Sequence, residues 1–186
     1  MTIEKIKLNT TALLKPFEYH NEMKDTLRSL IETSYCESID VKDSNCGDEI
    51  SRLDWSKYPD FDREWVRYVK PRLQEHFEIC ADDLNYRGCK IKGLWYQQYI
   101  KNNIHDWHIH GDNYTGVYYL ELPDDTPKTE LIDQNNKKIT IEADEGDIVI
   151  FPSFIIHRAP KMQSDSRKTI ISFNLEFEDC KEVKYD

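Results

Sequence analysis

Three histidines in the second half of the chain have the spacing of metal ligands. His108 and His110 stand two residues apart in the segment HDWHIH, and alternate residues of a β-strand share one face about 6–7 Å apart. Two imidazoles at that separation can bind one metal ion with bonds of about 2.1 Å. His157 follows the run GDIVIFPSFII and would supply a third ligand from a distant strand. Three protein ligands leave coordination positions open, so the pattern predicts a catalytic metal site.

A basic side chain near the last predicted strand is suited to bind a carboxylate. Arg167 stands ten residues after His157 and opens the run RKTIISFN, where Arg167 and Thr169 share one face of the strand. A guanidinium with a neighbouring hydroxyl can grip a carboxylate. Lys168 is the alternative anchor, because a one-residue bulge would exchange the faces of the two basic residues.

The histidines fall in a region of short predicted strands. From about residue 89, apolar runs alternate with turn signals in CKIKGLWYQQYI, TGVYYLELP, TELIDQNNKKITIEA, GDIVIFP and KTIISFNLEF. Asn135-Asn136 predicts a hairpin turn. GDIVIF is apolar on both faces, as in a strand that is covered on both sides. The pattern favours an α+β, mainly β fold of the jelly-roll (double-stranded β-helix) type.

The first half of the chain has helical periodicity. Residues 3–8 alternate like a short strand, whereas residues 20–35 and 62–79 predict helices, the second kinked or split at Pro71. The polar segment 40–60 predicts a surface loop, with a substrate lid as the alternative. We expect a single domain over 1–186, in which a helical support region (about 1–88) braces a jelly-roll catalytic core (about 89–178).

The composition indicates a folded, acidic, cytoplasmic protein. Hydrophobic residues make up 39% of the chain, which contains eleven Tyr, seven Phe and four Trp. The net charge of -10 disfavours nucleic acid as a partner. Five cysteines without CxxC spacing predict reduced thiols, and no segment predicts a leader or a membrane span. The oligomeric state is not encoded in any pattern that we recognise.

Two segments resemble the Fe(II)- and 2-oxoglutarate-dependent oxygenases, in particular the small prolyl-hydroxylase-like members of bacteria and phages. The segments are WHIHGDNYTGVYYLELP and GDIVIFPSFIIHRAPKMQSDSRKTIISFN, and the likeness spans roughly residues 95–175, about half of the chain. The family motif contains His-x-Asp, a distal His, and an Arg about ten residues further with Ser or Thr two beyond it. His157, Arg167 and Thr169 match its second part.

This sequence departs from the first part of the family motif. If His108 opens the motif, His110 replaces the carboxylate; if His110 opens it, Asp112 is the second ligand. We favour the first assignment, because Gly111-Asp112-Asn113 is the expected turn before the next strand. A regular strand would direct His105, three residues before His108, to the opposite face. Three neutral ligands leave the identity of the metal open.

The resemblance implies a 2-oxoglutarate-dependent dioxygenase that uses Fe(II), 2-oxoglutarate as cosubstrate and O2. Arg167 and Thr169 would hold the far carboxylate of 2-oxoglutarate, and hydroxylation of a substrate would release succinate and CO2. Tyrosines near the positions of Tyr99 and Tyr119 bind 2-oxoglutarate in prolyl-hydroxylase-like relatives, although both could instead be core aromatics. Family precedent suggests a prolyl or other amino-acid side chain in a peptide, or a small molecule, as the substrate.

Two other interpretations compete with this one. A cupin-type metalloprotein shares the Gly and Pro spacing before His157, but no Glu stands three to four residues beyond His110 and Arg167 would lack a role. A non-catalytic jelly-roll binding protein would make the histidines incidental. Metal content separates the binding protein from both enzymes, and dependence on 2-oxoglutarate separates the two enzymes.

Overall fold

Two antiparallel sheets and two long helices make up the fold. The computed structural model describes residues 8–42, 44 and 47–182. Its elements in chain order are β1 (Leu13–Pro16), α1 (His20–Thr33), β2 (Glu37–Ile39), β3 (Ile50–Leu53), the 3-10 helix η1 (Trp55–Lys57), α2 (Glu64–Asp83), β4 (Tyr86–Tyr99), β5 (His105–His108), β6 (Tyr114–Glu121), β7 (Glu130–Ile132), β8 (Lys138–Thr140), β9 (Asp147–Pro152), β10 (His157–Ala159) and β11 (Lys168–Cys180). The strand expected over residues 3–8 lies outside the described residues except for Leu8.

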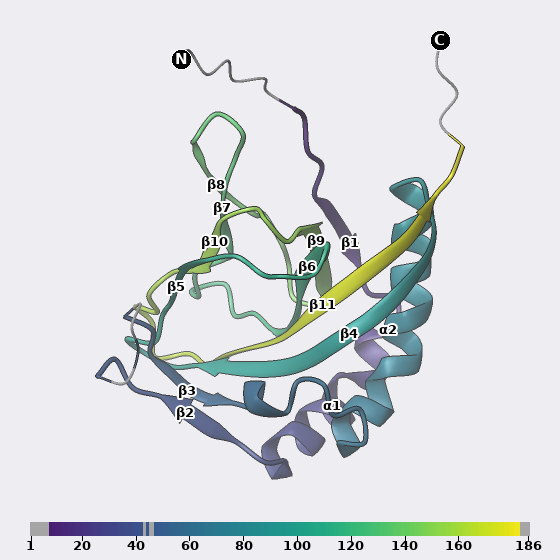
Figure 1. Ribbon diagram of the computed structural model, residues 1–186. Helices are drawn as coiled ribbons and strands as arrows, with labels where there is room; N and C mark the ends of the chain where they lie inside the picture. Colours follow the sequence, from purple (N-terminus) through teal and green to yellow (C-terminus); the bar gives the residue numbers. More distant parts are fainter. Residues whose placement is uncertain (1–7, 43, 45–46, 183–186) are drawn as a thin grey trace.

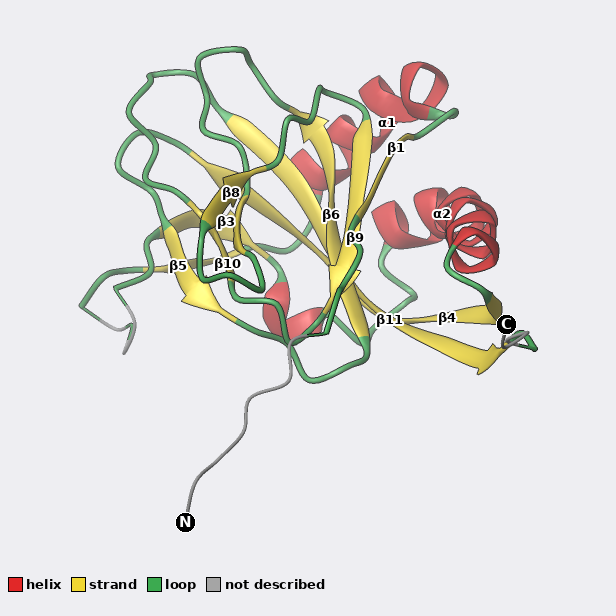
Figure 2. Ribbon diagram, turned by 90° about the horizontal axis from the view of Figure 1, so that it is seen from above, coloured by secondary structure: helices red, strands yellow, loops and turns green. Residues whose placement is uncertain are grey.

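The larger sheet has seven strands in the order β1-β9-β6-β11-β4-β3-β2, and the smaller has four in the order β5-β10-β7-β8. The long strands β4 and β11 form the middle of the large sheet, paired from Lys168 opposite Tyr99 to Cys180 opposite Tyr86. Figures 1 and 2 show the small sheet on one side of the large sheet and both helices on the other. This arrangement is the predicted jelly roll with helical bracing.

The helices cover the outer face of the large sheet with apolar side chains at helical spacing. Leu27 and Ile31 of α1 and Leu73 and Phe77 of α2 are fully buried and share one core with the strands. α2 is continuous over residues 64–83, so the split expected at Pro71 does not occur. Buried residues before and after Pro71 hold both halves of the helix against the sheet, which offsets the hydrogen bond that proline cannot make. None of the described helices is long and apolar enough to cross a membrane.

The N-terminal region contributes strands as well as helices. β1 pairs with β9, and β3 pairs with β4, so three short strands of this region extend the large sheet at both edges. The prediction of a loop over residues 40–60 is therefore wrong for the second half of that segment, which contains β3 and η1. Ile50 and Leu53 of β3 are buried in the inner core, but two apolar residues are too few to reveal a strand by periodicity. Asn136 has a φ of 58° between β7 and β8, which confirms the predicted hairpin turn.

Candidate active site

His108 and His157 are direct partners across two antiparallel strands of the small sheet. β5 pairs with β10 so that these two residues stand opposite each other, and their ring centroids are 4.2 Å apart. Nδ1 of His108 donates to the carbonyl oxygen of Asp106 at 2.6 Å, and Nδ1 of His157 donates to that of Ile155 at 2.9 Å. Because a carbonyl only accepts, each ring carries its hydrogen on Nδ1 and presents a free Nε2 lone pair.

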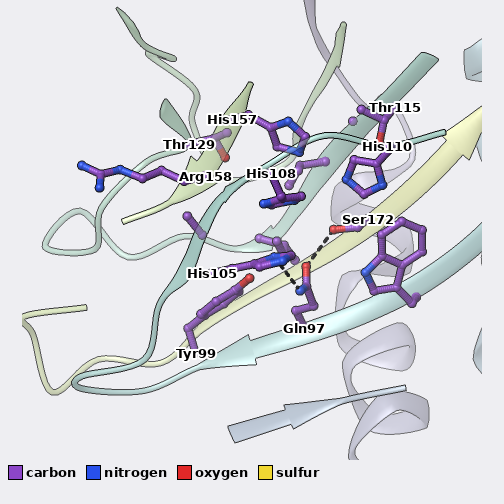
Figure 3. Close-up of a pocket in the computed structure, with 15 residues that line it drawn as sticks. Gln97, Tyr99, His105, His108, His110, Thr115, Thr129, His157, Arg158 and Ser172 are labelled. Atoms are coloured by element: carbon purple, nitrogen blue, oxygen red, sulfur yellow. Dashed lines mark hydrogen bonds between the residues drawn. The ribbon is translucent and has the colours of Figure 1, made fainter. Parts of the chain in front are cut away.

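His110 completes a group of three imidazoles. It lies just beyond the end of β5, where its backbone N–H donates to the carbonyl oxygen of Ser153 at 3.0 Å. One ligand nitrogen from each of His108, His110 and His157 lies within 4.8 Å of the others, close to the span of two metal–nitrogen bonds of about 2.1 Å. Asp112 lies in the bend before β6 and is not part of this group. Figure 3 shows the three rings gathered over one pocket.

Burial keeps these imidazoles neutral. Loss of solvent, followed by the influence of His108, lowers the pKa of His110 to about 4 and that of His157 to about 3. Burial also lowers the pKa of His108, against the smaller effect of its hydrogen bond to Asp106. A metal binds the neutral form of histidine, so at neutral pH all three rings are already in the ligating state.

His105 lies beside the three imidazoles, contrary to the expectation that it faces away. Its ring stacks on that of His108 at 3.8 Å between centroids. The cause is a bulge: β5 advances three residues, from His105 to His108, while β10 advances only from Ala159 to His157. The side-chain amide of Gln97 donates to Nδ1 of His105 at 3.3 Å, which leaves the hydrogen of that ring on Nε2.

The inner pocket lies between the three imidazoles and the large sheet. Its lining includes Tyr99, Thr129, Ile170 and Ser172, and its volume is about 20 Å³, room for about one water molecule. The hydroxyl of Tyr99 is buried and has no hydrogen-bond partner among the described residues. Orphaned buried hydroxyls are rare, so this one is available for a ligand.

Lys168 lies against Tyr99, a residue of the inner pocket, and on the same face of β11 as Ile170 and Ser172. It pairs in register with Tyr99, and its ammonium is 4.9 Å from the centroid of that ring. The ammonium donates to the carbonyl oxygen of Pro127 at 2.8 Å, and the residue is only 1% exposed. Burial lowers the pKa of Lys168 to about 7. A bound carboxylate would restore the charged form.

Tyr119 also faces the inner core, one strand away. Its hydroxyl donates to the hydroxyl of Thr129 at 2.7 Å, so Tyr119 reaches the inner pocket through Thr129. Burial raises the pKa of Tyr119 to about 12, so the phenol stays protonated and keeps this hydrogen bond at neutral pH.

Arg167 and Thr169 are not brought to the imidazoles. The guanidinium of Arg167 donates to both carboxylate oxygens of Glu121, at 3.0 and 3.1 Å, and to Glu32 of α1. The hydroxyl of Thr169 donates to the same carboxylate of Glu121. The pair does bind a carboxylate, but one of the protein's own, on the outer face of the sheet. β11 pairs with β4 without a bulge over residues 168–174, and this register turns Lys168 inward instead.

Comparison with known proteins places this site in a family. Residues 125–174, which include His157 and Lys168, match the family model described as putative 2OG-Fe(II) oxygenase. The fold is similar to that of a 2OG-Fe(II) oxygenase family oxidoreductase from Burkholderia pseudomallei, with a TM-score of 0.71 and 10% identity over 93% of this chain and 88% of that one. The matched segment and the fold both point to the 2-oxoglutarate- and Fe(II)-dependent oxygenases.

Two further solved oxygenases have the same fold. HygX from Streptomyces hygroscopicus, with nickel and 2-oxoglutarate bound, has a TM-score of 0.62 and 12% identity over 90% of this chain and 83% of its own. A prolyl hydroxylase from Trichoplax adhaerens, in complex with a hypoxia inducible factor peptide, has a TM-score of 0.63 and 15% identity over the same shares. No curated protein matches the sequence. The predicted superfamily, jelly-roll class, enzyme class and cofactors Fe(II), 2-oxoglutarate and O2 are confirmed.

The donor set of this oxygenase fits both groups. Three neutral imidazoles, of which His108 and His157 present a free Nε2, suit a divalent transition metal. The orphaned hydroxyl of Tyr99 and the buried ammonium of Lys168 suit an anion. The inner pocket is narrow, so a five-carbon diacid requires lining side chains to change rotamer on binding.

The oxygenase has a second cavity that adjoins the inner pocket at the imidazoles. This outer groove has a volume of about 260 Å³ and is bounded by Trp95, Gln97, His105, His108 and His110, which it shares with the inner pocket. The remainder of its lining comes from the N-terminal region and from the residue between two of the histidines: Ile39, Asp48, Ile50, Leu53, Trp55 and Ile109. Sequence analysis missed this groove, because its far wall lies in the segment expected to be a loop.

Proposed function

We propose that this oxygenase hydroxylates an aliphatic carbon of an amino-acid side chain in a peptide, or of a small molecule, with Fe(II) held by His108, His110 and His157. The observation that carries the proposal is the placement of two complementary sets of groups around one pocket. Neutral imidazoles lie at the small sheet, and a buried lysine lies on the large sheet beside a hydroxyl that has no partner among the described residues. The peptide-bound prolyl hydroxylase of the same fold supports a peptide substrate.

The three imidazoles hold the metal and leave positions open. When bound, the iron and 2-oxoglutarate supply oxidation by O2, which gives succinate, CO2 and one hydroxyl group on the substrate. The backbone carbonyls of Asp106 and Ile155 fix the tautomer and ring direction of two ligands. Because all three ligands are neutral, none of the ion's charge is offset by the protein, which favours a dianionic cosubstrate.

Lys168 and Tyr99 are proposed to hold the far carboxylate of 2-oxoglutarate. Both are buried, both belong to the large sheet, and neither is engaged with a carboxylate among the described residues. Tyr119 and Thr129 form the adjacent hydrogen-bonded pair on that wall. Arg167 and Thr169, which sequence spacing favoured, already share the carboxylate of Glu121, so the proposal moves the anchor by one residue.

The proposal is tested by anaerobic titration followed by turnover. Fe(II) and 2-oxoglutarate added without oxygen are expected to give a visible charge-transfer band, and admission of air should release succinate. His157→Ala is expected to abolish both signals. Metal binding without any effect of 2-oxoglutarate would instead favour the cupin-type interpretation, and folded protein that binds no metal would favour a binding protein.

A further inference from the structure

The outer groove has the chemistry of a cation-binding site placed next to the metal ligands. We infer that it binds the substrate through a positively charged amine or guanidinium group carried on an aliphatic chain. This inference rests on the proposed hydroxylase function and assigns a substrate class to it. Two observations carry it independently, the apolar and aromatic walls of the groove and its single kind of charge.

Apolar and aromatic side chains form most of the groove wall. Ile50 and Leu53 are each 1% exposed and close its floor, while Trp55 on η1 is 55% exposed and Ile109 between the histidines is 58% exposed. Large apolar side chains with that exposure at the edge of a cavity indicate a surface that a ligand covers. A chain of methylene groups would bury them without leaving polar atoms unpaired.

Among the described residues, Asp48 supplies the only charge that lines the groove. Its carboxylate accepts hydrogen bonds from the backbone N–H of Asp106 at 2.8 Å and from the hydroxyl of Ser44 at 3.3 Å. These neutral donors orient the carboxylate but leave its charge uncompensated, because no Lys or Arg of the described ranges forms an ion pair with it. A cation on the substrate would complete the pair.

The exposed indole ring of Trp55 in the groove is similarly available. Lysines and arginines lie over several aromatic rings of this protein, but within the described part of the chain none lies over Trp55 or Trp95. An indole face is the strongest aromatic binder of a cation. A carboxylate and an exposed indole in one groove therefore favour a cationic ligand, and the net charge of -10 favours its approach.

The inner pocket and the outer groove have ionisable groups of opposite kinds. The amine of Lys168 lies against Tyr99, which lines the inner pocket, and the carboxylate of Asp48 lines the outer groove. An anionic cosubstrate and a cationic substrate would thus be directed to different cavities beside the same metal ligands. An acidic substrate would meet Asp48 and be disfavoured in the outer groove.

The test is a binding experiment on the full chain, loaded with Ni(II) and 2-oxoglutarate under argon. Binding is measured by the quenching of tryptophan fluorescence. The probes are capped pentapeptides with two glycines on each side of a central lysine, norleucine or glutamate, and n-pentylamine as a small amine. The lysine peptide is expected to bind about tenfold or more tightly than the norleucine peptide, and the glutamate peptide more weakly than both. Whichever of the lysine peptide and n-pentylamine binds more tightly identifies the source of the cation, and either result supports the inference.

Asp48→Asn is expected to reduce the affinity for the lysine peptide to the affinity for the norleucine peptide. Asp124→Asn, which makes the same charge change on an exposed loop, should keep the preference. If Asp48→Asn lowers the melting temperature sharply, Trp55→Leu serves as the second variant and should reduce the preference by several-fold.

Equal binding of the lysine and norleucine peptides by the wild-type protein, or a preference retained in Asp48→Asn, would overturn the inference. Succinate release that depends on uncharged substrates would overturn it while leaving the proposed function intact, whereas lysine preference without succinate release would overturn the proposed function alone.

Discussion

Arg167 and Lys168 are consecutive residues whose side chains lie on opposite faces of the large sheet. Arg167 pairs with Glu121 and Glu32 beside α1, and Lys168 is buried against Tyr99 beside the inner pocket. A single step along the chain thus separates an ion pair that joins helix and sheet from a buried lysine that has no carboxylate partner among the described residues. The two residues can be substituted separately, which makes the proposed anchor directly testable.

Lys168→Met is expected to weaken binding of 2-oxoglutarate to the Co(II)-loaded protein by at least about 30-fold, as loss of one partner of a buried charge pair does. Arg167→Met, the matched control, should leave this affinity within about threefold. It should instead lower the melting temperature, because it removes the ion pair between Arg167 and Glu121. Isothermal titration calorimetry measures the first effect and thermal unfolding the second. A larger loss of affinity in the Arg167 variant would return the anchor to the residue that the sequence spacing favoured.

Tyr99→Phe is expected to weaken 2-oxoglutarate binding about tenfold without destabilising the protein. The hydroxyl that it removes is buried and unpartnered, so its loss should raise the free energy of unfolding or leave it unchanged. Tyr118→Phe is the control, because its buried hydroxyl is 2.7 Å from Nδ1 of His20 and its removal should cost about 1 kcal/mol. Urea unfolding separates the two variants. A clear loss of stability in Tyr99→Phe would mean that this hydroxyl has a structural partner.

Addition of Co(II) to metal-free protein is expected to raise the melting temperature, because an ion that binds only the native state stabilises it. His108→Ala, His110→Ala and His157→Ala should each abolish the rise. Asp112→Asn and His105→Phe should retain it, since neither residue belongs to the group of three ligand nitrogens. Loss of the rise in Asp112→Asn with its retention in His108→Ala would support the alternative ligand set of His110, Asp112 and His157.

Metal-free protein is expected to lose stability as the pH falls from about 6.5 towards about 4, with His76 as one cause. Burial lowers the pKa of His76 from 6.5 to about 4, and its Nε2 has no partner among the described residues. The unfolded chain binds a proton at His76 in this range and the native state does not, so acid favours unfolding by about 3 kcal/mol at most. His76→Leu should reduce the difference between the unfolding free energies at pH 7 and pH 4.5. An unchanged difference would show that His76 is not protonated on unfolding.

The candidate ligands were predictable because their chemistry is local in the sequence. The His-x-His pair and His157 are identified by residue type and by the strands that carry them, and the structure gathers all three. The choice against Asp112 followed from turn chemistry, which is also local. Helices α1 and α2 were predictable for the same reason, since each carries a regular apolar stripe.

The register of β11 was not predictable from its residues. The strand is buried on both faces, so the run TIISF lacks the alternation that would tell inward from outward positions. The position of His105 depends on a bulge produced by pairing with β10, a tertiary effect that no local pattern records. Asp48 and Trp55 lie in a polar segment without periodicity, and only the packing of β3 brings them to the groove.

The candidate ligands and the candidate cosubstrate anchor belong to different sheets. His108 and His157 lie on the short strands β5 and β10, whereas Tyr99 and Lys168 lie on the longest pair of strands in the protein. An ion and a diacid bound between them would connect the two sheets non-covalently. Removal of the ion with a chelator should therefore destabilise the four-stranded sheet first. The amide hydrogens of that sheet should then exchange with solvent well before those of β4 and β11.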